Sequence, residues 1–339
     1  MRPLRLLLAG LLSALVLALP ALAAGQAEEP ASTAYLAIRG VDAASSDVVR
    51  LTLAYDGDPA ALADATIVDN GEERPVEGDV VPLASTGATR AVAIVVDTSE
   101  AMDPVMADIR DTVTAIVEGL SVDIPITVIT ASDRVVPLRG LTTDRDTIDE
   151  AISDLRATGE SVIYDGIAGG AELLAEDAPA AQPTVIVVTG SGNYASTATP
   201  GTAIGALRDA GAPALVVGLD NERLDPGGLE EIVARAGGRF EMTPDSEALD
   251  EIGGEMAVGV DQQYVVAYEA PAGDEAGPVA DVTVQVGDTT TAASFVRGSV
   301  TTNPADLFPQ EVEAGSSSFF SSDLAKYLGV ALALAAAAV

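Results

Sequence analysis

The stretch AVAIVVDTSEAM, residues 91–102, contains the most informative pattern in the chain. Six apolar residues, 91–96, run directly into the acidic and hydroxyl residues DTSE at 97–100. A continuous apolar run of this length predicts a strand buried on both faces, as in a parallel sheet. Open α/β sheets bind ligands beyond the carboxyl ends of their strands. Asp97 and Ser99 are therefore candidate ligands for a cation.

Alternating strands and helices follow this stretch. The pattern predicts helices at residues 103–120, 142–157, 164–177, 201–212, 225–238 and 246–260, and strands at 91–96, 123–130, 134–141, 183–190, 213–220 and 239–243. This alternation is typical of an α/β domain, here residues 90–256, with a doubly wound, mostly parallel sheet covered by helices on both faces.

The segments on either side of this domain have β patterns. Residues 33–86 and 261–298 contain alternating or apolar runs separated by glycine- and aspartate-rich turns. Neither flank alone has enough strands for two packed sheets. Together they supply about seven strands, the number in an immunoglobulin-like sandwich. The sequence favours one discontinuous antiparallel β-sandwich with the α/β domain inserted in it. Two separate β caps are the alternative.

The N-terminal residues 1–24 are typical of a secretory signal peptide, because two arginines precede an apolar run that ends at Pro20 and small residues follow. An uncleaved anchor helix is the alternative, and residues 25–32 form a polar linker. At the other end, residues 299–322 are predicted to be a flexible linker.

Residues 323–339 are predicted to begin a transmembrane helix, because no charge occurs from Tyr327 to Val339. This run is shorter than the roughly 20 residues that span a membrane. The interpretation favours a helix that continues beyond Val339 over a weak anchor, and a buried helix of a soluble domain is a third alternative. We expect an exported protein, anchored to the cell membrane, with its α/β domain outside the cytoplasm.

Three features of residues 90–256, about half of the chain, together resemble a von Willebrand factor A (vWA) domain. They are the strand that ends in Asp97-x-Ser99, the sequence SVIYDGI at 161–167, and the buried run VIVVTG at 185–190. The resemblance implies a Rossmann-like fold and a non-enzymatic, protein-binding role. It also implies a magnesium ion at a metal-ion-dependent adhesion site, which takes an Asp-x-Ser-x-Ser loop, a threonine from a second loop and a later aspartate.

The match to that adhesion site is partial. Asp97 and Ser99 fit the first loop, and Ser161 fits the threonine position. Ala101 and Gly190 replace the second serine and the aspartate, and neither offers a ligand atom. The resemblance therefore implies a degenerate metal site that binds Mg²⁺ weakly, since magnesium usually needs one or two carboxylates. Neighbours that could substitute are Glu100, Glu160, Asp220, Ser191 and Asn193.

The alternative interpretation of these residues involves no metal. Asp97 and Ser99 would then cap loops and helix starts, and Ser161 would cap the helix that follows it. No cofactor is certain from the sequence.

The composition argues against catalysis and against nucleic-acid binding. The chain has no histidine, no cysteine and a single lysine, Lys326, so the usual bases, thiol nucleophiles and transition-metal ligands are missing. A metal-dependent hydrolase is therefore disfavoured. A formal net charge of −35 repels nucleic acid and anionic lipid headgroups.

The order of segments is similar to that of actinobacterial vWA proteins fused to a membrane domain of the tight-adherence pilus assembly (type II secretion system F) class. That resemblance implies a protein partner in the cell envelope, membrane attachment through the C-terminal segment and a role in pilus or secretion assembly. The alternative is a structural scaffold or an anchored adhesin with a vestigial site and no metal.

The charge of the chain predicts that salt stabilises it. With 52 acidic and 17 basic residues, the compact state repels itself, and physiological salt screens charges beyond about 8–10 Å. We expect the melting temperature to rise steadily as sodium chloride is added. A flat or falling curve up to molar salt would show that this repulsion does not control stability.

Overall fold

The structure is a computed structural model that describes residues 34–179, 181–271, 277–304 and 307. The predicted signal peptide, the linker after it and the predicted membrane segment all lie outside the described residues. Within the described ranges, no helix has both the length and the apolar character needed to cross a membrane.

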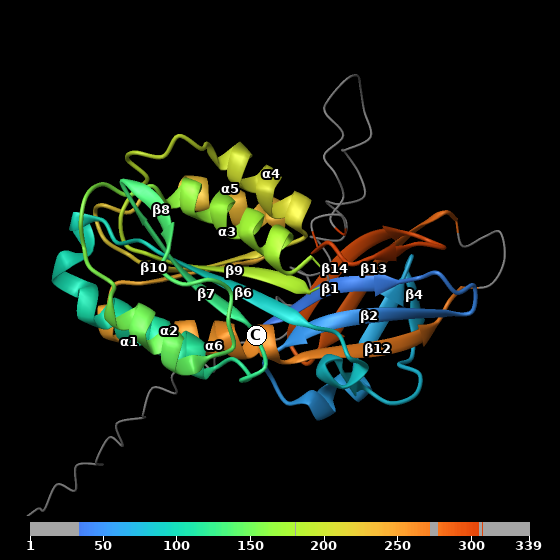
Figure 1. The fold of residues 1–339 in the computed structure, drawn as a ribbon. Helices are drawn as coiled ribbons and strands as arrows, with labels where there is room; N and C mark the ends of the chain where they lie inside the picture. Colours follow the sequence, from blue (N-terminus) through green and yellow to red (C-terminus); the bar gives the residue numbers. More distant parts are fainter. Residues whose placement is uncertain (1–33, 180, 272–276, 305–306, 308–339) are drawn as a thin grey trace, which may run out of the picture. The chain divides into compact units, whose positions relative to one another are not determined.

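A six-stranded sheet forms the centre of the α/β domain, in the order β11-β10-β9-β6-β7-β8 (Figure 1). Its strands are β6 (Arg90–Val96), β7 (Ile126–Ser132), β8 (Arg134–Pro137), β9 (Gln182–Thr189), β10 (Ala214–Leu219) and β11 (Arg239–Thr243). The edge strand β8 is antiparallel to β7, and the other neighbours are parallel. The predicted α/β fold with a mostly parallel sheet is confirmed.

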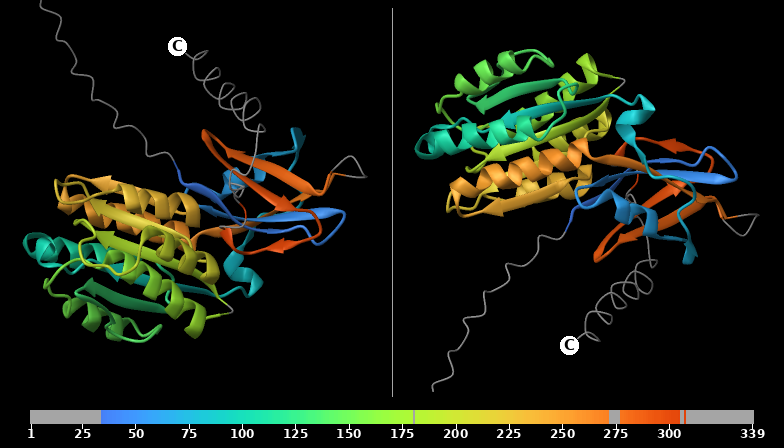
Figure 2. Two further views of the ribbon diagram at one scale, coloured as in Figure 1. Left: turned by 90° about the horizontal axis from the view of Figure 1, so that it is seen from above. Right: turned by 90° about the horizontal axis from the view of Figure 1, so that it is seen from below.

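Helices cover both faces of this sheet. The helices are α1 (Met106–Glu118), α2 (Arg145–Ser153), α3 (Ile163–Asp177), α4 (Pro200–Ala210), α5 (Gly227–Ala236) and α6 (Leu249–Asp261). Figure 2 shows α3 and α4 from above, and α1 and α6 from below. Successive β6 residues point to opposite faces, so Ile94 packs in the core with α1, α2 and α6, and Val95 packs with α3, α4 and α5.

Glycine lets α3 approach the sheet closely. A Cβ atom at Gly166 would lie 2.7 Å from Val95 Cγ1 and 2.9 Å from Ala131 Cβ. Any larger side chain there would push the helix away from the sheet. Gly166 therefore has a packing role.

The start of α1 differs from the sequence-based prediction. The helix was expected from Asp103, but residues Glu100–Val105 form a 3-10 helix and α1 begins at Met106. Pro104 lies inside this short turn. Proline has no N–H to donate, so a short 3-10 turn accommodates it before the regular helix begins.

The flanking segments form two antiparallel sheets. The five-stranded sheet has the order β15-β1-β2-β12-β5 and the four-stranded sheet the order β14-β13-β3-β4. Their strands are β1 (Leu36–Asp42), β2 (Val48–Tyr55), β3 (Thr66–Asp69), β4 (Glu72–Arg74), β5 (Val81–Pro82), β12 (Gln263–Glu269), β13 (Val279–Val286), β14 (Thr289–Val296) and β15 (Val300–Thr301). Because β2 pairs with β12 and β3 pairs with β13, each sheet contains strands from both flanks, and the flanks share one hydrophobic core.

The sandwich also includes residues beyond 298. Strand β15 pairs with Val41 and Asp42 of β1. Leu307 is fully buried in the core of the sandwich, and its carbonyl accepts a hydrogen bond from Ser294 N of β14. The linker predicted at 299–322 therefore starts too early, because its first residues satisfy strand edges and fill the core.

A buried ion pair links the two flanks inside the sandwich. Asp69, at the end of β3, is 1% exposed, and its carboxylate accepts two hydrogen bonds from Arg297, of 3.0 and 2.5 Å. Tyr268 Oη of β12 donates to the same carboxylate over 3.0 Å. Burial, and then the charge of Asp69, raise the pKa of the Tyr268 hydroxyl, so it remains a donor. One carboxylate thus ties together both sheets.

Asp69→Asn should destabilise the chain by about 3 kcal/mol, because it breaks a buried, hydrogen-bonded ion pair. Urea unfolding followed by circular dichroism measures this. The matched control is Asp42→Asn, which removes an exposed partner that lies 3.9 Å from Arg50. The control should change stability by less than about 0.5 kcal/mol. Equal effects of the two variants would contradict a role of the buried pair in joining the flanks.

Candidate functional site

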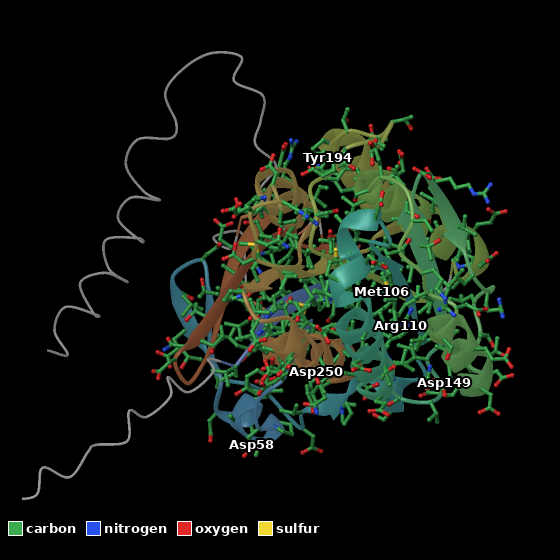
Figure 3. All side chains as sticks on the ribbon, turned by 90° about the vertical axis from the view of Figure 1, so that its left-hand side faces the viewer. Asp58, Met106, Arg110, Asp149, Tyr194 and Asp250 are labelled. Carbon is green, nitrogen blue, oxygen red and sulfur yellow. The ribbon has the colours of Figure 1, made fainter. Side chains whose placement is uncertain are left out.

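Three loops meet at the carboxyl edge of the central sheet, at the end of the molecule that Figure 3 faces. They comprise residues 97–101 after β6, residues 158–162 before α3, and residues 189–195 at the end of β9. Thr158 N donates to Thr98 O (2.7 Å), and Glu100 N donates to Gly159 O (2.9 Å). These bonds fix the first two loops against each other.

The third loop is fixed in the same way. Asp97 N donates to Val188 O (2.8 Å), and Tyr194 N donates to Ser161 O (3.2 Å). All three loops are therefore connected by backbone hydrogen bonds before any side chain is considered.

The carboxylate of Asp97 is the centre of this site. Asp97 is fully buried, and its Oδ1 accepts from Ser99 N over 3.0 Å. Its Oδ2 accepts from Thr189 Oγ1 (2.9 Å) and from Ser191 Oγ (2.5 Å). A buried carboxylate needs such donors, because an uncompensated charge away from water is very costly. Both carboxylate oxygens are thus engaged by the protein itself.

Of the three sequence-predicted ligands, Ser99 lies within this network. Its Oγ is 3.1 Å from Ser191 Oγ and donates to it, since the one hydrogen of the Ser191 hydroxyl is donated to Asp97. Ser99 stands at the start of the 3-10 helix, but its side chain makes no capping bond. The alternative that Ser99 caps a helix is wrong.

Ser161 is the unsatisfied member of the site. It is fully buried, and its Oγ has no hydrogen-bond partner among the described residues. The helix α3 begins after Val162 with no side-chain cap, so Ser161 is not a helix cap. An unpaired buried hydroxyl costs about 1–3 kcal/mol, which identifies Ser161 Oγ as an oxygen that a bound ion or water can use.

Among the substitutes considered from sequence, the structure brings Ser191 to Asp97. Glu100, Glu160 and Asp220 are exposed, and Asn193 Oδ1 accepts from Ser196 Oγ and Tyr164 N. In the described part of the chain, no group of three or more acidic residues could hold a metal ion. Thr189, which sequence reasoning missed, also bonds Asp97. Its position just before Gly190, at the end of a buried strand, was the available signal.

The two residues that replace expected ligands, Gly190 and Ala101, make other contacts. A Cβ atom at Gly190 would lie 3.0 Å from Leu219 Cβ and 3.1 Å from Met102 Cε, so an aspartate has no ready space there. Ala101 O accepts a hydrogen bond from Arg223 Nη1 over 3.2 Å. The guanidinium of Arg223 is therefore bonded to the backbone of the residue at which the resemblance implies a ligand serine.

This donor set suits a divalent cation poorly. Magnesium prefers octahedral oxygen coordination with one or two carboxylates and retained waters. Here the hydroxyls of Ser99 and Ser161 are neutral, and the one buried carboxylate already accepts three hydrogen bonds. A cation would have to displace Ser191 Oγ or Thr189 Oγ1 to reach Asp97 Oδ2.

The comparisons with known proteins agree with this fold. Residues 92–193 match the model of the von Willebrand factor type A domain. The matched range includes Asp97, Ser99, Ser161 and Gly190. Such domains are generally protein-interaction modules. No curated protein is significantly similar to the chain.

Several solved structures are similar to the chain. A von Willebrand factor type A protein from Catenulispora acidiphila is 13% identical over 78% of this chain and 72% of that chain, with a TM-score of 0.49. The conserved hypothetical protein BatB from Bacteroides thetaiotaomicron is 16% identical over 51% and 100%, with a TM-score of 0.42. Proximal thread matrix protein 1 from the mussel byssus, with a zinc-occupied MIDAS motif, is 19% identical over 55% and 49%, with a TM-score of 0.45. None of these similarities assigns a ligand or a partner to this chain.

The site geometry predicts weak divalent binding. Calorimetric titration of the chain with magnesium or manganese should give a dissociation constant on the order of millimolar or weaker. Asp97→Asn keeps the shape of the side chain and should reduce the remaining heat of binding. Micromolar binding that Asp97→Asn abolishes would instead mean that Glu100, Glu160 or Asp220 completes the coordination.

Variants that restore a ligand side chain at position 101 or at position 190 test the two positions separately. Ala101→Ser adds a hydroxyl at a half-buried position and should strengthen manganese binding. Gly190→Asp should lower the free energy of unfolding by about 1–3 kcal/mol, because Leu219 and Met102 have to move. Thermal unfolding of both variants separates these effects, and an equally stable Gly190→Asp chain would contradict the steric argument.

Proposed function

We propose that the chain is a non-enzymatic, extracytoplasmic protein-binding module that uses the carboxyl edge of its vWA-like sheet. The observation that carries this proposal is Tyr194, which is 64% exposed at the site (Figure 3). Its backbone N–H is bonded to Ser161 O, and its hydroxyl donates to Arg223 O over 3.0 Å. An exposed aromatic side chain held in one position is suited to be an anchor residue in a protein interface.

The chemistry of the site supports binding rather than catalysis. The hydroxyls of Thr189 and Ser191 donate to Asp97, and the chain has no histidine that could activate them. The same network supports the proposal of a degenerate adhesion site. A surface whose buried charge is already compensated does not need a metal to keep its shape.

The cellular setting belongs to the proposal as well. The pattern of residues 1–24 supports export, and the uncharged run at the C-terminus supports attachment to the cell membrane. The partner would then be a protein of the cell envelope. The similarity of the segment order to actinobacterial vWA proteins with tight-adherence membrane domains supports a role in pilus or secretion assembly.

A structural scaffold or anchored adhesin with a vestigial site is the second candidate. The observation in its favour is the closed hydrogen-bond network of Asp97, Thr189 and Ser191, which holds the loops together without any ligand. In that case the contacts with partners lie elsewhere on the molecule.

Crosslinking in cells tests the proposed function. The full chain carries an affinity tag, and the envelope proteins crosslinked to it are quantified by mass spectrometry. Tyr194→Ser should reduce capture of the principal partner at least about tenfold, as expected for the loss of an anchor residue. The matched control is Val122→Ser, which removes an apolar side chain that is 75% exposed just before β7, at the amino edge of the sheet.

Chelation of divalent cations should leave capture unchanged. Equal capture by the Tyr194→Ser and unmodified chains would support the scaffold instead, with its contacts away from the carboxyl edge.

A further inference from the structure

We infer that Arg223, beside Tyr194, is the receptor for a carboxylate of the protein partner. The inference rests on the proposed function and specifies the chemistry of the partner. It is carried by three observations on Arg223: its fixed position, its exposure and the lack of an ion pair with any residue that the structure describes.

Arg223 is held in position at both ends. It lies in the loop between β10 and α5, and its backbone oxygen accepts from Gly192 N (2.7 Å) and from Tyr194 Oη (3.0 Å). Its backbone nitrogen donates to Asn221 Oδ1 over 2.8 Å. At the other end, Nη1 donates to Ala101 O. Arg223 therefore contacts two loops of the site, one through its backbone oxygen and one through its guanidinium, which lowers the conformational entropy that is lost when a ligand binds.

The charge of Arg223 is not neutralised within the described residues. None of the ion pairs there includes Arg223, although Glu222 and Asp225 are close to it in sequence. Of its five N–H donors, the described side-chain bonds use those on Nη1. In a chain with 52 acidic residues, an exposed, fixed arginine with remaining donors is available to an acceptor from outside.

The geometry of the group favours a carboxylate. A planar guanidinium presents paired donors that match the two oxygens of a carboxylate, and such charge-assisted pairs are stronger than neutral hydrogen bonds. The same positive charge, bonded to the loop that carries Asp97, opposes a divalent cation nearby. The phenol ring of Tyr194 adds apolar contact area next to the charge. The partner segment is therefore an aspartate or glutamate next to an apolar side chain.

A peptide titration with chelator present tests the receptor. The probe is acetyl-Gly-Leu-Asp-Gly-amide, and the same peptide with asparagine in place of aspartate is the control. Binding to the isotopically labelled full chain is followed by NMR at the backbone amides of Ala101, Gly192 and Tyr194. We expect saturable shifts with the aspartate peptide and about tenfold weaker binding of the asparagine peptide, since a charged hydrogen bond is lost.

Two variants test whether peptide binding depends specifically on the charge of Arg223. Arg223→Gln removes the charge but keeps a donor for Ala101 O, and it should weaken the aspartate peptide about tenfold. Arg235→Gln removes the same charge from the exposed face of α5, where the arginine pairs with Glu231, and should leave binding within about twofold. Unchanged amide spectra away from the site show that both variants are folded.

Several results would contradict the inference that Arg223 binds a carboxylate of the partner. They are unchanged binding in Arg223→Gln, equal loss in Arg235→Gln, binding that requires magnesium, or tighter Arg223-dependent binding of inorganic phosphate than of the peptide. Failure of the peptide to bind, while capture in cells still depends on Tyr194, would contradict the role of Arg223 as a carboxylate receptor. That result would leave the proposed protein-binding function intact. If capture does not depend on Tyr194, the proposed function fails, and the inference resting on it fails too.

Discussion

Complete burial of the central strand β6 is the constraint on which the α/β domain depends. All seven of its residues, Arg90–Val96, are buried, and their apolar side chains alternate between the two hydrophobic layers. Such a strand is stable only when parallel neighbours satisfy its backbone and helices cover both of its faces. The same burial extends to the next residue, so a charged carboxylate is placed at the edge of the core.

The chemistry of the site follows from that placement. Asp97 must find donors inside the protein, and the hydroxyls of Thr189 and Ser191 supply them. A carboxylate satisfied in this way has less to offer a cation, and a second carboxylate at position 190 would require Leu219 and Met102 to shift. The hydrogen bonds that hold the loops together are thus the same ones that occupy the carboxylate of Asp97. In the proposed function, the exposed side chains of Tyr194 and Arg223 make the contacts with the partner.

The β-sandwich depends on a different buried charge. Asp69 receives hydrogen bonds from Arg297 and Tyr268, which lie some 200 residues later in the sequence. The pairing of β3 with β13 and of β2 with β12 gives each sheet strands from both flanks, and the flanks share one hydrophobic core. Arg90 Nη1 adds a bond to Asp261 Oδ1 over 2.9 Å, from the first residue of β6 to the last of α6. The start and end of the α/β domain are thereby held together.

The sequence by itself determined the α/β pattern. The continuous apolar run 91–96 indicates a strand buried on both faces, and the helical spacing of apolar residues after it indicates helices buried on one face. It also placed Asp97 and Ser99 at the sheet edge, since strand direction fixes where the strand's carboxyl end lies. The tertiary structure alone decided which hydroxyls reach Asp97 and whether Ser161 is satisfied. It also decided that Arg223 Nη1 would donate a hydrogen bond to Ala101 O, 122 residues earlier in the sequence. No repeating pattern in the sequence predicts such contacts between loops. They form because parallel strands bring loops that are distant in the sequence to one edge of the sheet.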